Sequence, residues 1–348
     1  MTANAFYRAG PLVCAMLAAS GASAQSEFFA GKTIAILAGS SAGGGYDTYA
    51  RLLARHYGRH IPGNPAIVVQ NMPGAGGKVV TSFIANVAAK DGTAIAATYP
   101  QALTEPLFDD RSKYKYEPEK LSYVGSMNGE PYYCFVTRNS PVQKMEDLRD
   151  KEFLIGGTAP GASTMTSPAL LSNLLGLKFK VIAGYKGSRE ITLAAMQGEV
   201  HGWCGMGWSA SQATVRQQLE SGEVRILFQE NGEFNDRVRA MKIPRATDLA
   251  TNPDDRRILD IVYSQQLYGR PYVAPPGIDP QRLAILSKAF MAAIADPALV
   301  ADAKKLSLDL RPISGEDLSK MIADLYATPQ ALVAKAKAAL DISKAMGR

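Results

Sequence analysis

A glycine-rich segment is the part of this chain best suited to hold an anion. Residues 39–47 read Gly-Ser-Ser-Ala-Gly-Gly-Gly-Tyr-Asp, and they join a strand-like run at 33–37 to a helix-like run that begins near Tyr46. Such a turn presents free backbone N–H groups, and the positive end of the helix dipole lies behind them. Residues 73–77 and 156–164 repeat this design. The sequence therefore predicts several anion-facing helix starts around one cleft.

The N-terminal segment has the features of a secretory signal. Arg8 precedes an apolar run at residues 11–19, and Gly-Ala-Ser-Ala follows at residues 21–24. A positive residue, a short apolar core and small residues before the cleavage point define such signals. We therefore predict that residues 1–24 form a signal peptide cleaved near Ala24, and that the mature chain is exported. The apolar run is too short to span a bilayer.

The composition argues against several classes of function. The 348 residues include 38 Lys and Arg and 32 Asp and Glu, a net charge of +6 that falls to +5 when Arg8 leaves with the signal peptide. The basic residues are scattered and form no dense run with interleaved aromatic side chains, so we do not expect nucleic acid as a partner. With three histidines and no cysteine pair at ligand spacing, we expect neither a metal site nor a cofactor.

Two cysteines remain in the mature chain, Cys134 and Cys204, and both lie in apolar, strand-like surroundings. An oxidising compartment permits a disulfide between them. Two buried free thiols are an equal alternative, because free cysteine is among the most often buried residue types. The sequence leaves both possibilities open.

Strand-like and helix-like runs alternate along two stretches of the chain, residues 32–99 and 132–229. The rhythm of the first is βαβαβ, which favours a parallel sheet covered by helices. Residues near 127–131 and near 229–232 connect the two stretches, so we predict two α/β lobes with a hinge and a cleft between them. Ligands of open parallel sheets bind beyond the carboxyl ends of the strands, where the glycine-rich turns lie.

The expected boundaries assign residues 25–128 and 230–348 to lobe 1 and residues 129–229 to lobe 2. Two parts of lobe 1 read as irregular connections, namely residues 104–123 and the long stretch after Gln229. The helices expected in lobe 1 lie near 46–60, 77–89, 280–295, 297–306, 315–326 and 329–346.

The first turn also fits a different class of protein. Gly39-x-Ser41-x-Gly43 matches the G-x-S-x-G nucleophile elbow of α/β-hydrolases, in which a serine occupies a sharp turn between a strand and a helix. His201 would have to serve as the base. Two further glycines extend the turn beyond what an elbow needs, and no HGGG-type segment precedes it. A secreted serine hydrolase that uses Ser41 is therefore the alternative function.

Five short motifs occur in a fixed order along the chain. They are Ala-Gly-Gly-Gly-x-Asp at 42–47, Asn-x-Pro-Gly-Ala-Gly-Gly at 71–77, Lys-Asp-Gly-Thr at 90–93, Tyr-Lys-Gly at 185–187 and Val-Ala-Pro-Pro-Gly at 273–277. Together they resemble the substrate-binding proteins of tripartite tricarboxylate transporters, often called Bug receptors. The resemblance covers nearly the whole mature chain.

This resemblance implies an α/β fold of the type II periplasmic binding protein class, with two lobes, two crossover strands and a ligand cleft. It implies a periplasmic receptor that is not an enzyme. The receptor would be a monomer that closes on a small organic carboxylate, aliphatic or aromatic, and delivers it to the permease subunits in the membrane. The residues that the resemblance and the neighbouring pattern implicate in binding are Ser40, Ser41, Ala42, Gly43, Gly44, Tyr46, Thr158, Ala162, Ser163, Thr164, Tyr185 and His201.

Three positions depart from the family pattern. The family often has Thr where this chain has Tyr46, His where it has Thr166, and Asp where it has His201. The turns that hold the anion are retained, whereas residues that would choose the ligand differ. The sequence therefore predicts a carboxylate without deciding between mono- and dicarboxylates. A ligand-sensing module that serves a signalling kinase is a further alternative.

Overall fold

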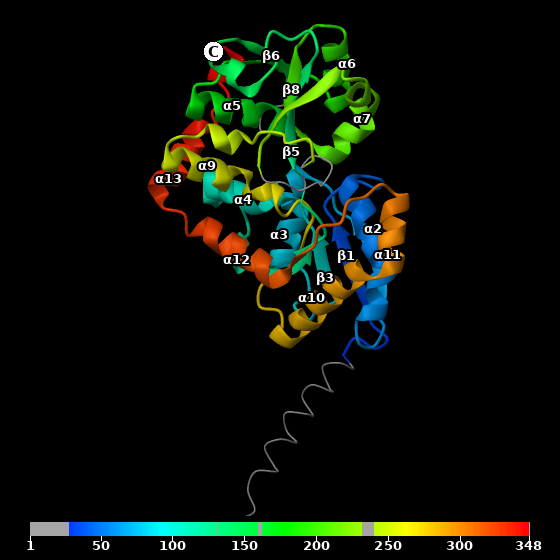
Figure 1. The fold of residues 1–348 in the computed structure, drawn as a ribbon. Coiled ribbons are helices and arrows are strands. Elements are labelled where there is room, and N and C mark those ends of the chain that lie inside the picture. Colours follow the sequence, from blue (N-terminus) through cyan, green and yellow to red (C-terminus); the bar gives the residue numbers. More distant parts are fainter. Residues whose placement is uncertain (1–27, 130, 159–161, 232–239, 348) are drawn as a thin grey trace, which may run out of the picture.

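The computed structural model describes residues 28–129, 131–158, 162–231 and 240–347. The predicted signal peptide lies outside the described residues. Figure 1 shows two sheets, one above the other, each accompanied by helices. The fold is therefore α/β with two lobes, as the sequence predicts.

The first sheet has six strands in the order β11-β4-β10-β3-β1-β2. Strand β1 is parallel to β2 and β3, which confirms the βαβαβ rhythm expected for residues 32–99. Strand β10 is antiparallel to β3 and β4, because the chain leaves this sheet at β4 and re-enters it at β10. The bounds are β1 Thr33–Ala38, β2 Ala66–Asn71, β3 Ala94–Ala97, β4 Ser122–Ser126, β10 Pro271–Ala274 and β11 Ile313–Ser314.

The second sheet has five strands in the order β7-β6-β8-β5-β9. Strand β6 is parallel to β7 and β8, whereas β5 is antiparallel to β8 and β9. The carboxyl ends of β6 and β8 consequently lie at the same edge of this sheet. The bounds are β5 Tyr132–Thr137, β6 Phe153–Gly156, β7 Phe179–Ile182, β8 Gly202–Gly207 and β9 Val224–Gln229.

Helices provide the apolar cover of the first sheet through two separate clusters. One cluster includes Leu52 of α2 and Phe290 of α10, and the other includes Ile84 of α3 and Leu318 of α12. Helix α2 forms because its apolar residues recur every three or four positions, so that one face is buried and its arginines are exposed. The bounds are α2 Gly45–Tyr57, α3 Lys78–Asn86, α4 Pro100–Phe108, α10 Pro280–Ala295, α11 Pro297–Lys305 and α12 Gly315–Tyr326.

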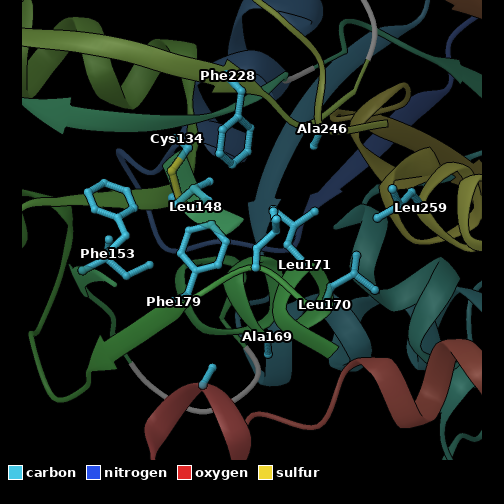
Figure 2. Packing of buried hydrophobic residues seen from close by; sticks show 14 of the residues in the cluster. Cys134, Leu148, Phe153, Ala169, Leu170, Leu171, Phe179, Phe228, Ala246 and Leu259 are labelled. Carbon is cyan, nitrogen blue, oxygen red and sulfur yellow. A yellow bond between two sulfur atoms is a disulfide. The ribbon is translucent and has the colours of Figure 1, made fainter. Parts of the chain in front are cut away.

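The second sheet also has two apolar clusters. Figure 2 shows part of the larger one, in which the rings of Phe153, Phe179 and Phe228 lie around Cys134. The smaller one includes Ile191 of α6. The helices of this lobe and the helices that pack on it are α5 Ser163–Leu175, α6 Ser188–Met196, α7 Trp208–Ser221, α9 Pro253–Tyr263 and α13 Gln330–Ala339.

The C-terminal part of the chain is shared between the two lobes. Strand β10 joins the first sheet, and α10 and α12 pack on it, whereas α9 and α13 contact α5 and place Leu259 and Ala336 in the second core. The described chain re-enters the first sheet at β10 through residues 264–270, whereas the sequence analysis places the second crossing near residues 229–232. The expected boundary, with all of 230–348 in lobe 1, describes only part of this packing.

Cys134 of β5 and Cys204 of β8 form a disulfide. Both residues are fully buried, and the two strands are hydrogen-bonded neighbours, so the sulfur atoms lie within bonding distance. Of the two alternatives that the sequence leaves open, the structure has the disulfide. It joins the strand by which the chain enters the second lobe to the central strand of that lobe.

Two features are missing from the described part of the chain. No single helix there is both long and apolar enough to cross a membrane, and α10 and α11 reach that length and composition only as a pair bent by 61°. Nor does any group of three or more His, Cys, Asp or Glu side chains among these residues have an arrangement that could hold a metal ion.

Candidate functional site

The first glycine-rich turn, between β1 and α2, is held in shape by a carboxylate. Asp47, in the first turn of α2, is only 2% exposed. Its carboxylate accepts hydrogen bonds from Arg51 Nε at 2.9 Å and from the Gly43 N–H at 2.8 Å. The Asn71 amide donates a third at 2.8 Å, and Ser40 Oγ accepts the Asp47 N–H at 3.0 Å. The hydrogen bond from Arg51, together with those from Gly43 and Asn71, lowers the pKa of Asp47 to about 2. The inner side of the turn therefore carries a negative charge at neutral pH.

The outer side of this turn is open to solvent. Ser41, Ala42, Gly43 and Gly45 are exposed. The Gly43 N–H is held by Asp47, and the Gly44 N–H donates to the Ser41 carbonyl at 3.0 Å. For the N–H groups of Ser41, Ala42 and Gly45, the described residues offer no acceptor. Three backbone donors therefore remain for an anion at the positive end of α2.

An arginine that the sequence analysis does not single out lies beside this turn. The Arg270 guanidinium carbon is 4.5 Å from the ring centroid of Tyr46 and 5.1 Å from that of Tyr49. Its Nη2 would be 3.5 Å from a Cβ built on Gly45. Tyr46 also packs on Tyr99, with ring centroids 3.8 Å apart, and is only 8% exposed. The Tyr46 ring therefore packs between the Arg270 guanidinium and the Tyr99 ring and is not exposed to solvent.

The second turn leads from β6 into α5. Ser163 Oγ donates to the Gly205 carbonyl at 2.7 Å, and Thr164 Oγ1 accepts the Thr158 N–H at 3.1 Å. The hydroxyl oxygens of Thr158 and Thr164 are 2.9 Å apart, and Ala162 is the N-cap of α5. The N–H groups of Ser163 and Thr164 have no protein acceptor in the described residues. The hydroxyls thus shape the turn, and the backbone N–H groups of Ser163 and Thr164 are left as hydrogen-bond donors.

The backbone of Tyr185 lies next to the second turn. Its N–H donates to the Gly157 carbonyl at 3.3 Å, and the neighbouring Gly184 N–H donates to the Thr158 carbonyl at 3.0 Å. The Tyr185 hydroxyl is 3.4 Å from a carboxylate oxygen of Glu199. The main chain of this predicted site residue therefore borders the turn, while its hydroxyl is engaged by Glu199, which follows the end of α6.

His201 lies at the other end of the second lobe's central strand. It immediately precedes β8 and lines a cavity of about 300 Å³ together with Arg138 and Glu223. Gly205, which contacts Ser163, is four residues further along, a distance of roughly 13 Å at the rise of a β-strand. The structure does not bring His201 next to the second turn.

The third glycine-rich segment, residues 73–77, allows close packing. Gly77 has a φ of +85°, and a Cβ built there would be 2.9 Å from the backbone nitrogen of Tyr99 and 3.0 Å from Thr98 Oγ1. Only glycine fits such a position without displacing its neighbours. The segment therefore brings α3 close to the end of β3.

One short segment reaches both glycine-rich turns, the one between β1 and α2 and the one between β6 and α5. Gln266 Nε2 donates to the carboxylate of Glu230 at 2.9 Å, and Glu230 in turn accepts the Gly205 N–H at 2.9 Å beside the second turn. Arg270, four residues after Gln266, lies against Tyr46 at the end of the first glycine-rich turn. Four extended residues span at most about 14 Å. Each turn is thus linked to one end of residues 266–270, a connection that no local sequence pattern indicates.

The geometry gives no support to a nucleophile elbow at Ser41. None of the hydrogen bonds among the described residues joins Ser41 to a histidine. His56, in the last turn of α2, contacts Asp302, and His60, three residues beyond the helix, contacts Asp296, whereas His201 belongs to the other lobe. The Ser41–His201 pair that the alternative requires is not formed.

Solved structures of similar fold include solute-binding proteins. A TctC solute-binding protein from Polaromonas shares 20% identity with this chain, with coverage of 87% of this chain and 98% of that one and a TM-score of 0.68. An R. palustris protein with adipate also shares 20% identity, with coverage of 88% and 97% and a TM-score of 0.60. At this level of identity the likeness establishes the fold.

Sequence comparison extends the likeness to the family. A Cupriavidus necator protein, described as the UPF0065 protein in the gbd 5′ region, is 27% identical over 331 residues and covers 92% of both chains. The family model of the tripartite tricarboxylate transporter family receptor, TctC, matches residues 50–337. The chain therefore belongs to the TctC family of periplasmic solute-binding proteins.

Proposed function

We propose that this protein captures a small organic carboxylate between its two lobes and delivers it to a membrane permease of the tripartite tricarboxylate transporter type. The observation that carries the proposal is the presence of two open helix starts, at residues 41–45 and 162–164, linked to opposite ends of residues 266–270. We expect the two turns to face one cleft. The proposal includes a signal peptide at residues 1–24 and a monomeric receptor in the periplasm.

The available groups suit a carboxylate. A carboxylate only accepts hydrogen bonds, and both turns offer backbone N–H donors at the positive end of a helix. Each charge-assisted hydrogen bond contributes about 1.5–3 kcal/mol. Four or five of them, after the cost of association, support micromolar affinity, roughly −8 kcal/mol. Arg270 adds a positive charge beside the first turn.

The comparisons support the chemical class. The R. palustris protein of similar fold is described with adipate, an aliphatic dicarboxylate. The family description places such receptors with a tricarboxylate transporter. A small organic acid is therefore the ligand class to test first, with adipate as one member of the panel.

Binding would act through the relative position of the lobes. A ligand held by both turns makes all of its contacts only when the lobes are close, so it shifts the population toward the closed arrangement. Closure also removes water from around the hydrogen bonds. The permease would then select the closed, loaded form over the empty one.

A thermal-shift screen of the protein purified from the periplasm tests the function. The panel contains aliphatic and aromatic mono- and dicarboxylic acids, adipate included. A ligand that binds the folded state raises the melting temperature with concentration. We expect a subset of acids to do so and the same acids to reduce the radius of gyration in solution scattering. Absence of stabilisation by every acid contradicts the proposal.

Serine substitutions test the site. Ser41→Ala and Ser163→Ala should weaken binding of the acid found in the screen without unfolding the protein, whereas Ser319→Ala, on the exposed face of α12, is the matched control. Both site variants keep their backbone N–H donors, so unchanged affinity in both would show that neither hydroxyl is needed to shape its turn for binding. A covalent adduct at Ser41 after incubation with a serine-reactive phosphonate would instead favour the hydrolase. A neighbouring gene for a permease or for a kinase separates transport from sensing.

A further inference from the structure

A buried carboxylate stands behind the second turn. Glu230, the first residue after β9, is 1% exposed. Its Oε1 accepts hydrogen bonds from Ser167 Oγ at 2.5 Å and from the Gly205 N–H at 2.9 Å. Its Oε2 accepts the Gln266 amide at 2.9 Å. The donors come from α5, from β8 and from the segment that returns to the first lobe, so one side chain joins three elements.

Gly205 transmits the position of Glu230 to the second turn. Its N–H is bonded to Glu230 and its carbonyl accepts Ser163 Oγ at 2.7 Å. Gly205 has a φ of +72°, and a Cβ built there would be 2.3 Å from the Ser163 carbonyl oxygen. The two backbones therefore lie in direct contact, and a shift of Gly205 displaces the start of α5.

Gln266 connects the same carboxylate to the segment by which the chain enters the second lobe. Its Oε1 accepts the N–H of Tyr132, the first residue of β5, at 3.1 Å. Because the Gln266 Nε2 donates to Glu230, both ends of its amide have defined roles, and the amide cannot be flipped without placing two donors face to face. The chain of hydrogen bonds thus runs from Tyr132 through Gln266 and Glu230 to Gly205.

We infer that Glu230 is a positioning residue that fixes the second ligand turn relative to the two segments connecting the lobes, so that lobe movement and carboxylate binding are coupled through it. This inference rests on the proposed function. Glu230 does not touch the ligand in this account. It sets the place of the Ser163 and Thr164 amides through Gly205.

The test exchanges the two polar side chains. In Glu230→Gln one carboxylate oxygen is replaced by an NH₂ group, which faces the NH₂ group of Gln266. If the Gln266 amide flips, its NH₂ group instead faces the N–H of Tyr132. The pair Glu230→Gln with Gln266→Glu restores a donor for every acceptor. In this pair the new amide oxygen at position 230 accepts from Ser167 and Gly205. The new carboxylate at position 266 accepts from the amide nitrogen at position 230 and from the Tyr132 N–H. Restoration by the exchanged pair is a result that loss of packing alone cannot give.

Two measurements are made on each variant at about pH 8.5, where the Glu230 carboxyl, whose pKa burial raises to about 7, is ionised and accepts every hydrogen bond described above. Amide hydrogen exchange by NMR reports the Gly205 N–H in the ligand-free protein, and calorimetry reports affinity for adipate and the other acids of the panel. We expect about tenfold faster exchange and about tenfold weaker binding in Glu230→Gln. The exchanged pair should return both to within about threefold of wild type. Glu220→Gln, an exposed partner of Arg216, should change neither.

The outcomes separate the two proposals. Three results would each overturn the positioning role. They are a wild-type rate of Gly205 amide exchange in Glu230→Gln, no recovery of that rate in the exchanged pair, and faster exchange spread uniformly over all strands. If Glu230→Gln does not fold, the exchanged pair and Ser167→Ala, which removes a single donor, decide by the same readouts. If exchange at Gly205 responds as expected but no acid binds the wild type, the proposed function fails and the structural coupling stands.

Discussion

The carboxylate of Asp47 lies 2.8 Å from the backbone nitrogen of Gly43, so an acidic side chain stands directly behind a turn proposed to bind an acid. The arrangement is consistent because Asp47 uses its oxygens on Gly43, Arg51 and Asn71, on the inner side. With the Gly43 N–H turned inward, the donors at Ser41, Ala42 and Gly45 remain on the outside. The hydrogen bonds of Asp47 therefore fix the conformation of the turn.

Asp47→Asn should loosen the glycine-rich turn between β1 and α2. The amide cannot accept from both Arg51 and Gly43 as the carboxylate does, and one of its atoms is a donor. We expect a loss of about 1–3 kcal/mol in the free energy of unfolding and weaker carboxylate binding. Urea denaturation and calorimetry measure the two effects. Asp254→Asn is the control, because Asp254 also lies in a helix first turn and pairs with Lys335 but is 51% exposed.

The same residue predicts a pH dependence. The folded-state pKa of Asp47 is lowered from 3.8 to about 2, so its contribution to stability is present above pH 3.8 and is lost as the pH falls through 2. A shift of this size corresponds to about 2 kcal/mol. The unfolding free energy of wild type should therefore drop more steeply than that of Asp47→Asn between pH 4 and pH 2. Parallel curves for the two proteins would contradict the role of this carboxylate.

Arg270→Gln should weaken binding of the carboxylate found in the screen by about tenfold and reduce its sensitivity to salt, because a positive charge beside the turn is removed. The affinity of Arg270→Lys should lie between those of the wild type and Arg270→Gln, since lysine keeps the positive charge but lacks the planar guanidinium. Arg111 packs on Tyr326 in the same way, at 5.3 Å, and Arg111→Gln is the matched control. An equal loss in both variants would show a general effect of charge.

The sequence predicts the local part of the site and not the part made by tertiary contacts. The glycine-rich turns are visible because glycines and a following helix pattern are adjacent in the chain. Glu230 is not visible, since its donors are 25, 36 and 63 residues away. The sequence analysis expects an irregular segment where α9 forms, although Asn252 caps this helix and Pro253 opens it, a recognisable start signal. Its burial against α5 is what makes it a helix of the second core.

The disulfide should contribute to stability without being open to reagents. Cys134 and Cys204 are fully buried and 70 residues apart, and closing a loop of that length stabilises by about 2–4 kcal/mol. The double variant Cys134→Ala, Cys204→Ala should lose this amount in urea denaturation. Reductant should affect the wild type only after unfolding. Alkylation of two thiols in protein denatured without reductant contradicts the prediction.

Glu230 should give the opposite pH dependence to Asp47. Burial raises its pKa from 4.5 to about 7, against the lowering effect of its hydrogen bonds. The folded state then holds a proton that the unfolded state has released, so this contribution to stability is full below pH 4.5 and is lost as the pH rises through 7. Tyr263 of α9 is the titratable side chain whose pKa the Glu230 charge raises further. Between pH 4.5 and 7 the wild type should lose about 3 kcal/mol relative to Glu230→Gln, and equal slopes would refute this.

Gly205→Ala should separate close contact from backbone strain. Gly198 and Gly205 both have a positive φ, +81° and +72°, but a Cβ at Gly198 meets nothing within 4 Å whereas one at Gly205 meets the Ser163 carbonyl at 2.3 Å. Alanine at either position bears the cost of a left-handed conformation, roughly 1–2 kcal/mol. Only at Gly205 must the start of α5 move as well.

We therefore expect both alanine variants to be destabilised, and Gly205→Ala alone to lose at least about tenfold in affinity for the carboxylate found in the screen. The comparison is made at a temperature where both variants are fully folded, so that stability does not enter the binding constant. Equal affinities for Gly198→Ala and Gly205→Ala would mean that the second turn binds its ligand independently of β8. Because the Ser163 and Thr164 amides are fixed to the helix that Gly205 contacts, a displaced turn should weaken every acid of the panel to a similar extent.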